Sequence, residues 1–239
     1  MLIEDIKQKL TLYESAHSPK PPRRSAVLVP LIFPETEPGA APGEIPDAEP
    51  GKASGRIPDA EPDKASGRIP APEPLLLFEQ RSFALKHQPG EVCFPGGRVE
   101  DGEAPRETAL REICEELLIS PEQVEILSPL NAFESSTDQT ISAFVGRVTG
   151  YHGSFSRDEV EQVFTIPLSW FLTHEPNRYT TMRTVVPGED FPYDLIPGGR
   201  NYPWKRIRHT VPVYPDTDPV IWGLTARITD ALCKALGGY

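Results

Sequence analysis

The feature that most constrains this chain is a glycine turn followed by an acidic helix, over residues 97–119. On a helix that advances by about 100° per residue, Glu112 and Glu116 lie nearly above one another, and Glu115 lies about 60° to one side. The apolar residues of the stretch point to the opposite side: Leu110, Ile113, Cys114 and Leu117. We therefore predict a helix that buries its apolar face and presents three carboxylates within about one and a half turns.

Like charges at this spacing need compensation. Carboxylates four residues apart on a helix repel each other by about 0.2–0.5 kcal/mol per pair. A divalent cation reverses the sign of that interaction, because Mg²⁺ prefers oxygen ligands and completes its shell with water and substrate phosphates. A solvated acidic face is the simpler interpretation of a lone glutamate pair, so the spacing of the whole segment has to decide between the two.

That spacing resembles a known motif. From Gly97 the chain runs through five residues to Glu103 and then through seven residues to Arg111, where REICEELLI begins. This string resembles the Nudix box, G-x5-E-x7-R-E-U-x-E-E-x-G-U, in which U is a bulky aliphatic residue. Every charged position of the motif is filled, which argues against a mere solvated face.

The one departure from the motif is Leu118, which stands where the family has glycine. A glycine there lets a helix end in a left-handed turn. Because leucine avoids that conformation, we expect the helix to end a few residues later, near Ser120 and Pro121.

The resemblance implies a hydrolase that cleaves a diphosphate linked to another group and uses Mg²⁺ or Mn²⁺. The implied metal ligands are the carbonyl of Gly97 and the carboxylates of Glu112, Glu115 and Glu116. Arg111 is expected to orient the catalytic glutamates through ion pairs, and Glu103 to fix the preceding loop to the helix.

The general base is less determined. In some members of the family it is a glutamate of the box, and in others it comes from a downstream loop. Glu159 and Glu161 are candidates for the base or for a further metal ligand, and both can equally be solvated loop acids.

The segment before the box, LLLFEQRSFALKHQPGEVCFPGG, resembles the coenzyme A diphosphatase branch, which carries L-L-x-x-x-R-S and then L-x-x-H-x-G-x-V-x-F-P-G-G. The spacing from His87 to Gly90 is one residue longer than in that pattern. The resemblance implies cleavage of coenzyme A, or a derivative, to 3′,5′-ADP and 4′-phosphopantetheine. The 3′-phosphate needs cations, for which the candidates are Arg81, Lys86, His87 and Arg98.

Other substrates stay open from sequence alone. ADP-ribose, NADH or an oxidised nucleotide would suit the same box. A noncatalytic nucleotide sensor is a third interpretation, which the presence of all three box glutamates disfavours. The predicted partner is a small nucleotide, and a homodimer is compatible with the sequence.

Composition excludes several classes. The formal net charge of −11 argues against a nucleic-acid polymer as partner, and no apolar run approaches the 18 residues of a membrane span. The three cysteines form no CxxC motif. We therefore expect a reduced, cytoplasmic protein without a disulfide framework.

The chain divides into an N-terminal helix and linker (1–24) and a Nudix domain (25–236). The domain is interrupted at 34–74 by a proline-rich 12-residue repeat, for which we predict disorder. Predicted strands lie at 25–33, 75–80, 91–94, 124–133, 141–148, 164–166, 181–186 and 206–213. A terminal helix is predicted at 220–236, and the aromatic residues between Phe191 and Trp204 are candidates for a pocket or for packing. The alternation of helices with mixed strands predicts an α/β/α sandwich.

Overall fold

The structure is a computed structural model that describes residues 24–33, 73–135 and 139–239. The predicted N-terminal helix lies outside these residues, as does the repeat insertion apart from its last two residues. The strands on either side of the insertion are direct neighbours, because Ile32 pairs with Leu75. The division into a domain with an inserted repeat stays a prediction.

The main sheet is mixed. Its strands are β1 (Arg24–Ile32), β2 (Leu75–Arg81), β3 (Val92–Cys93), β4 (Gly96–Arg98), β5 (Val124–Glu134), β6 (Thr140–Val148) and β7 (Val160–Pro167). The order is β3-β2-β1-β6-β5, with β4 beside β1 and β7 beside β2. The β1–β6 pair is parallel, whereas β1 pairs with β2 and β4 in the antiparallel sense.

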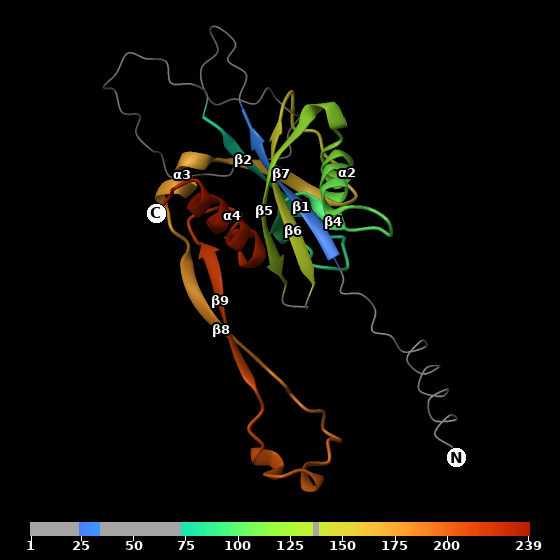
Figure 1. Cartoon of the computed structure of the whole chain (residues 1–239), viewed down its shortest axis with the longest axis vertical. Coiled ribbons are helices and arrows are strands. Elements are labelled where there is room, and N and C mark those ends of the chain that lie inside the picture. The colour runs from blue at the N-terminus through green and yellow to red at the C-terminus, as the bar shows by residue number, and fades with distance from the viewer. Residues whose placement is uncertain (1–23, 34–72, 136–138) are drawn as a thin grey trace, which may run out of the picture.

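Helices cover both faces of this sheet (Figure 1). The acidic helix α2 (Pro105–Leu117) packs on one face, while α3 (Leu168–Thr173) and α4 (Gly223–Ala235) pack on the other. The result is the predicted α/β/α sandwich with a mixed sheet. None of the helices in the described part of the chain is long and apolar enough to cross a membrane.

Strand β2 divides its side chains between the two cores. Leu77 packs in the core under α2, and Phe78 packs in the opposite core, where its ring lies 4.9 Å from that of Phe94 and 5.5 Å from that of Phe164. Because side chains alternate along a strand, Glu79 returns to the α2 side. This alternation delivers a carboxylate from the sheet to the helix that carries the box glutamates.

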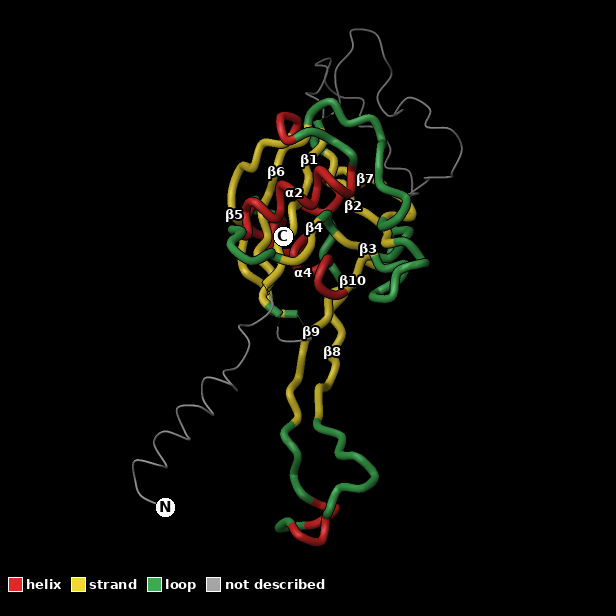
Figure 2. The backbone as a smooth tube through the Cα atoms, turned by 90° about the vertical axis from the view of Figure 1, so that its right-hand side faces the viewer, coloured by secondary structure: helices red, strands yellow, loops and turns green. Residues whose placement is uncertain are grey.

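A second sheet leaves the body of the molecule as an arm. It contains β8 (Asn177–Thr184), β9 (Arg206–Tyr214) and β10 (Ile221–Trp222), and β8 and β9 form a long antiparallel hairpin. Figures 1 and 2 show this hairpin projecting beyond the sandwich. Both strands were predicted in part, but β8 begins four residues before the predicted start at 181.

The aromatic residues between Phe191 and Trp204 pack on one another at the end of the arm. The ring of Phe191 lies 5.1 Å from that of Tyr193 and 5.6 Å from that of Trp204, and Tyr202 lies 4.8 Å from Trp204. This arrangement fits the packing interpretation, since the arm end lies away from α2 (Figures 1 and 2).

The expected shift of the helix end toward Ser120 is wrong. Helix α2 ends at Leu117, and Leu118 itself adopts the left-handed conformation, with φ 54° and ψ 46°. The N–H groups of Leu118 and Ile119 both donate to the carbonyl of Cys114, as in a glycine-terminated helix. Leucine therefore accepts a backbone conformation that costs an L-residue about 1–2 kcal/mol.

We expect Leu118→Gly to raise the free energy of unfolding by about 0.5–1 kcal/mol, because relief of the left-handed strain exceeds the entropy that glycine adds to the unfolded chain. Urea denaturation measures this change. Leu118→Ala is the matched control, since alanine shortens the 60% exposed side chain but keeps the strain. Equal stabilities of the glycine and alanine variants would contradict the strain.

Candidate active site

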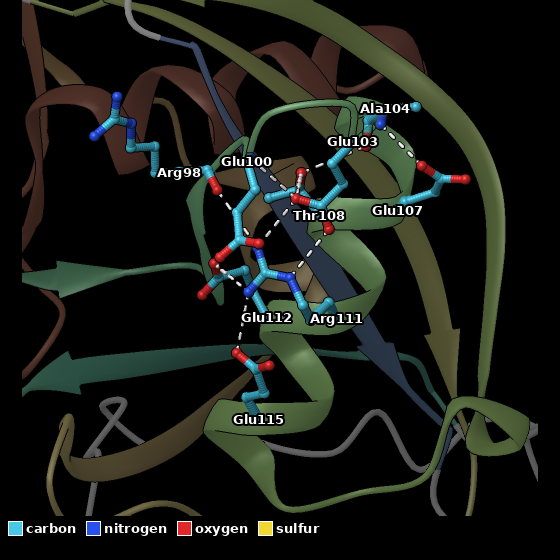
Figure 3. A network of polar contacts seen from close by, with 9 residues as sticks. All are labelled: Arg98, Glu100, Glu103, Ala104, Glu107, Thr108, Arg111, Glu112 and Glu115. Carbon is cyan, nitrogen blue, oxygen red and sulfur yellow. Dashed lines mark hydrogen bonds and ion pairs between the residues drawn. The ribbon is translucent and has the colours of Figure 1, made fainter.

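The outer face of α2 is organised by Arg111 (Figure 3). Its Nε donates to Glu103 Oε1 at 3.0 Å. Its Nη1 donates to Glu112 Oε1 at 2.8 Å and to Glu115 Oε2 at 3.1 Å. One guanidinium thus holds two box glutamates and ties them to the loop that precedes the helix.

Glu103 anchors that loop to the first turns of α2. It accepts hydrogen bonds from the Thr108 hydroxyl at 2.7 Å and from the Glu100 N–H at 3.2 Å, in addition to those from Arg111. The hydrogen bonds from Arg111 and Thr108 lower the pKa of Glu103 to about 2. Glu103 is therefore ionised at neutral pH and fully engaged in structural contacts.

Glu112 and Glu116 lie against the glycine turn at Gly96 and Gly97. The Gly96 N–H donates to Glu116 Oε2 at 2.8 Å. A side chain on Gly97 would place its Cβ 2.3 Å from Glu112 Oε1, and one on Gly96 would lie 2.3 Å from the Ala26 carbonyl oxygen. A side chain at Gly96 would therefore clash with the β1 backbone, and a side chain at Gly97 would displace the Glu112 carboxylate.

The three box glutamates do not converge on one point. Glu112 and Glu116 lie against the turn, whereas the Glu115 side chain is 61% exposed and reaches outward to Arg111. Across the described residues, no group of three or more His, Cys, Asp and Glu side chains is arranged as a ready metal site. Helical spacing predicted three carboxylates on one face of the helix, and the structure brings Glu112 and Glu116, but not Glu115, against the turn.

Burial raises the pKa values of the inner carboxylates, Glu112 and Glu116. Desolvation raises the pKa of Glu116 to about 8, with further contributions from the charges of Glu112 and Glu159. Desolvation also raises the pKa of Glu112, against the opposing effect of its hydrogen bond from Arg111. Without a bound cation, Glu116 therefore tends to keep its proton at neutral pH.

Sequence reasoning missed Glu79, which contributes a further carboxylate from β2. It is 1% exposed, and desolvation followed by the charge of Glu116 raises its pKa. It follows an apolar run on β2 and precedes Gln80 and Arg81, so the sequence signal was limited to an acid at a position in register with Leu77. Cys93, directly opposite Glu79 on β3, has its thiol pKa raised by burial and by the same carboxylates.

Glu159 lies in the turn before β7 and is exposed. Its charge is among the leading influences that raise the pKa of Glu79, Glu112 and Glu116. Glu161 is also exposed, on β7. The electrostatic influence of Glu159 on the inner carboxylates makes it the stronger candidate of the two acids.

Of the predicted phosphate-binding cations, Arg81 comes nearest to the carboxylates. Its charge lowers the pKa of Glu79 and Glu116, opposing their burial, and its Nε donates to the His87 carbonyl at 3.4 Å. Lys86 and His87 are exposed in the loop that follows β2. Arg98 directs its side chain away from the network of Figure 3, while its carbonyl accepts from Arg111 at 3.4 Å.

The residues of this site fit a divalent cation. Glu79 Oε1 is buried and lacks a hydrogen-bond partner within the described residues, and the carboxylates around it are under-neutralised. Oxygen donors of this kind suit Mg²⁺ or Mn²⁺, and Mg²⁺ commonly takes only one or two carboxylates from the protein, leaving the rest of its shell to water and phosphate.

Comparisons with known proteins assign the family. The NUDIX domain model matches residues 67–187. The uncharacterised Nudix hydrolase NudL of Citrobacter koseri is 42% identical over 166 residues, which cover 69% of this chain and 76% of that protein. The chain therefore belongs to the Nudix hydrolase family, whose members act on diphosphate bonds and generally use divalent metals.

The chain is also similar to two other proteins. The mouse peroxisomal coenzyme A diphosphatase NUDT7 is 38% identical over 118 residues, which cover 48% of this chain and 49% of the mouse protein. The match thus spans about half the length of that relative. A MutT/nudix family protein from Enterococcus faecalis superposes with a TM-score of 0.46 at 15% identity, covering 97% of this chain and 70% of that one.

The raised pKa of Glu116 predicts a pH dependence of stability in metal-free protein. Because its folded pKa, about 8, exceeds the ordinary value of 4.5, the native state binds more protons than the unfolded state between these values. The free energy of unfolding should therefore fall as the pH rises from about 5 to about 8. We expect Glu116→Gln to flatten this fall in chelator-treated protein, measured by urea denaturation.

The exposed Glu115 provides the control, since Glu115→Gln removes the same charge from the same helix. We expect this variant to keep the slope of the unmodified protein. A Glu116→Gln variant with an unchanged slope would contradict the assignment of the raised pKa.

Proposed function

We propose that the chain hydrolyses the diphosphate of coenzyme A or of its derivatives, with 3′,5′-ADP and 4′-phosphopantetheine, or its acyl form, as products. The observation that carries the proposal is the position of Arg81 at the end of β2. Its charge acts on the buried carboxylates of Glu79 and Glu116, and the loop with Lys86 and His87 begins directly after it. The likeness to the mouse coenzyme A diphosphatase supports the same substrate.

Each side chain has a role in this reaction. Glu112 and Glu116, with the Gly97 carbonyl, would hold the cation at the glycine turn, and Glu115 would contribute from the outer side. A bound Mg²⁺ or Mn²⁺ supplies neutralisation of the diphosphate charge and activation of the attacking water. Arg111 fixes the carboxylates of Glu112 and Glu115 through hydrogen bonds from its Nη1. Positioning and charge stabilisation then provide most of the rate.

Arg81 would hold a phosphate group of the substrate beside the carboxylates. Lys86 and His87, farther along the same loop, are suited to the 3′-phosphate because they are exposed and cationic or protonatable. Arg98 is a weaker candidate, since its side chain leaves the network in Figure 3. The cysteine usage favours a reducing compartment such as the cytoplasm, and a homodimer remains compatible with this site.

Glu159 is proposed as the general base, because it is exposed to solvent and yet close to the three inner carboxylates. We expect Glu159→Gln to lower kcat by about 10²–10⁴-fold, the usual contribution of a positioned base. The matched control is Glu161→Gln, two residues farther along, which should stay within about threefold of the unmodified enzyme. Similar losses in both variants, or in neither, would exclude Glu159 as the base.

The substrate is tested with a panel of coenzyme A, ADP-ribose, NADH and 8-oxo-dGTP, each with Mg²⁺ or Mn²⁺ and with products identified by mass spectrometry. We expect preferential release of 3′,5′-ADP from coenzyme A. Including 3′-dephospho-coenzyme A tests the loop, since Lys86→Gln should weaken only the preference for the 3′-phosphate, whereas Lys205→Gln on the arm should not.

Preferential cleavage of another member of the panel would overturn the coenzyme A assignment while keeping the metal-dependent helix. A folded protein that cleaves none of them would overturn the proposed function as a whole.

A further inference from the structure

Glu79 is an unusual residue for the middle of a buried strand. It is 1% exposed, and its β2 neighbours Leu76, Leu77 and Phe78 are wholly buried apolar residues. Moving a carboxylate to such a position costs several kcal/mol unless it is paired and hydrogen-bonded. An apolar residue would fill the same place under α2 without that cost, as Leu77 does two positions earlier.

The hydrogen bonds of Glu79 do not explain its presence. Its carboxyl group contacts that of Glu116, which is itself an acid, and Glu79 Oε1 lacks any hydrogen-bond partner in the part of the chain that the structure describes. Buried carboxylates that serve only to hold a fold are normally saturated by donors. Glu79 therefore has an unused oxygen in a carboxyl group that contacts a second buried carboxyl group.

The charges around Glu79 are mostly of its own sign. Glu116 and Glu159 repel its charge, and Arg81 is the cation among the leading influences on it. Arg81 also acts on Glu116 and contacts Cys93, so its single charge is shared. When both are ionised, Glu79 and Glu116 carry two negative charges, of which Arg81 can offset only one.

We propose that Glu79 and Glu116 together bind a divalent oxygen-preferring cation, Mg²⁺ or Mn²⁺, between β2 and α2. This inference rests on the proposed function for the presence of the cation, and it adds a ligand that the box motif does not contain. Two protein carboxylates suffice, because water and substrate phosphates complete the shell of such a cation. The unpartnered Oε1 of Glu79 is the free donor that the cation needs.

The proposal is tested by titrating the full chain with Mn²⁺ alone, using calorimetry for affinity and electron paramagnetic resonance for the count of free ions. Glu79→Gln keeps the shape and removes the anionic donor, so we expect Mn²⁺ affinity to fall by at least about tenfold or one site to be lost. Glu79→Asp withdraws the carboxylate by one methylene and should give an intermediate loss.

The matched control is Glu125→Gln, which removes an exposed carboxylate on β5 and should leave Mn²⁺ binding unchanged. Circular dichroism establishes that each variant is folded, and Glu79→Asp decides the question if Glu79→Gln does not fold. Unchanged affinity and stoichiometry in the folded Glu79 variants would overturn the proposal, as would an unmodified chain that binds no Mn²⁺ at millimolar concentration.

The binding readout separates this inference from the substrate. Loss of Mn²⁺ binding in Glu79→Gln, in a chain that cleaves another diphosphate, would support the cation site and reject coenzyme A. Normal Mn²⁺ binding in Glu79→Gln, in a chain that cleaves coenzyme A, would reject Glu79 as a ligand and retain the proposed function.

Discussion

The burial of several neighbouring carboxylates is the constraint on which the rest of the site depends. Glu79, Glu112 and Glu116 are brought together beneath the Gly96–Gly97 turn, and burial raises the pKa of each. A fold gains nothing from this concentration of charge by itself. This concentration of carboxylates is explained if a cation binds among them during function. Hydrolysis of a diphosphate also requires such a cation.

The α/β/α sandwich brings these carboxylates together through ordinary packing rules. The apolar face of α2 fixes the helix on the sheet, and its opposite side then carries Glu112 and Glu116 to the turn. Strand alternation brings Glu79 to the same place from below. The pairing of β4 with β1 fixes the turn itself, since Gly97 lies opposite Ala26. Helix, strand and turn are therefore each placed by apolar contacts or backbone pairing, and the carboxylates meet as a consequence.

The sequence was sufficient for the parts that depend on local spacing. The box predicted α2, its acidic face and the glycine turn, and alternating helices and strands predicted the three-layer fold. The helix end at Leu118 was predicted wrongly, because the N–H groups of Leu118 and Ile119 close the last turn on the Cys114 carbonyl despite a local preference of about 1–2 kcal/mol against that conformation. Glu79 was not predicted, because its place beside Glu116 depends on how β2 packs against α2. The projection of the β8–β9 arm could not be predicted either, because the pattern of a strand does not show which sheet it joins.

The most direct test of the central claim is to locate Mn²⁺ by anomalous X-ray diffraction from crystals of the full chain soaked in the metal. The account predicts an anomalous peak at the Gly96–Gly97 turn, within coordinating distance of the carboxylates of Glu112 or Glu116. A peak found only elsewhere, or no peak under conditions in which the enzyme is active, would contradict the claim that this buried cluster of carboxylates is the metal site.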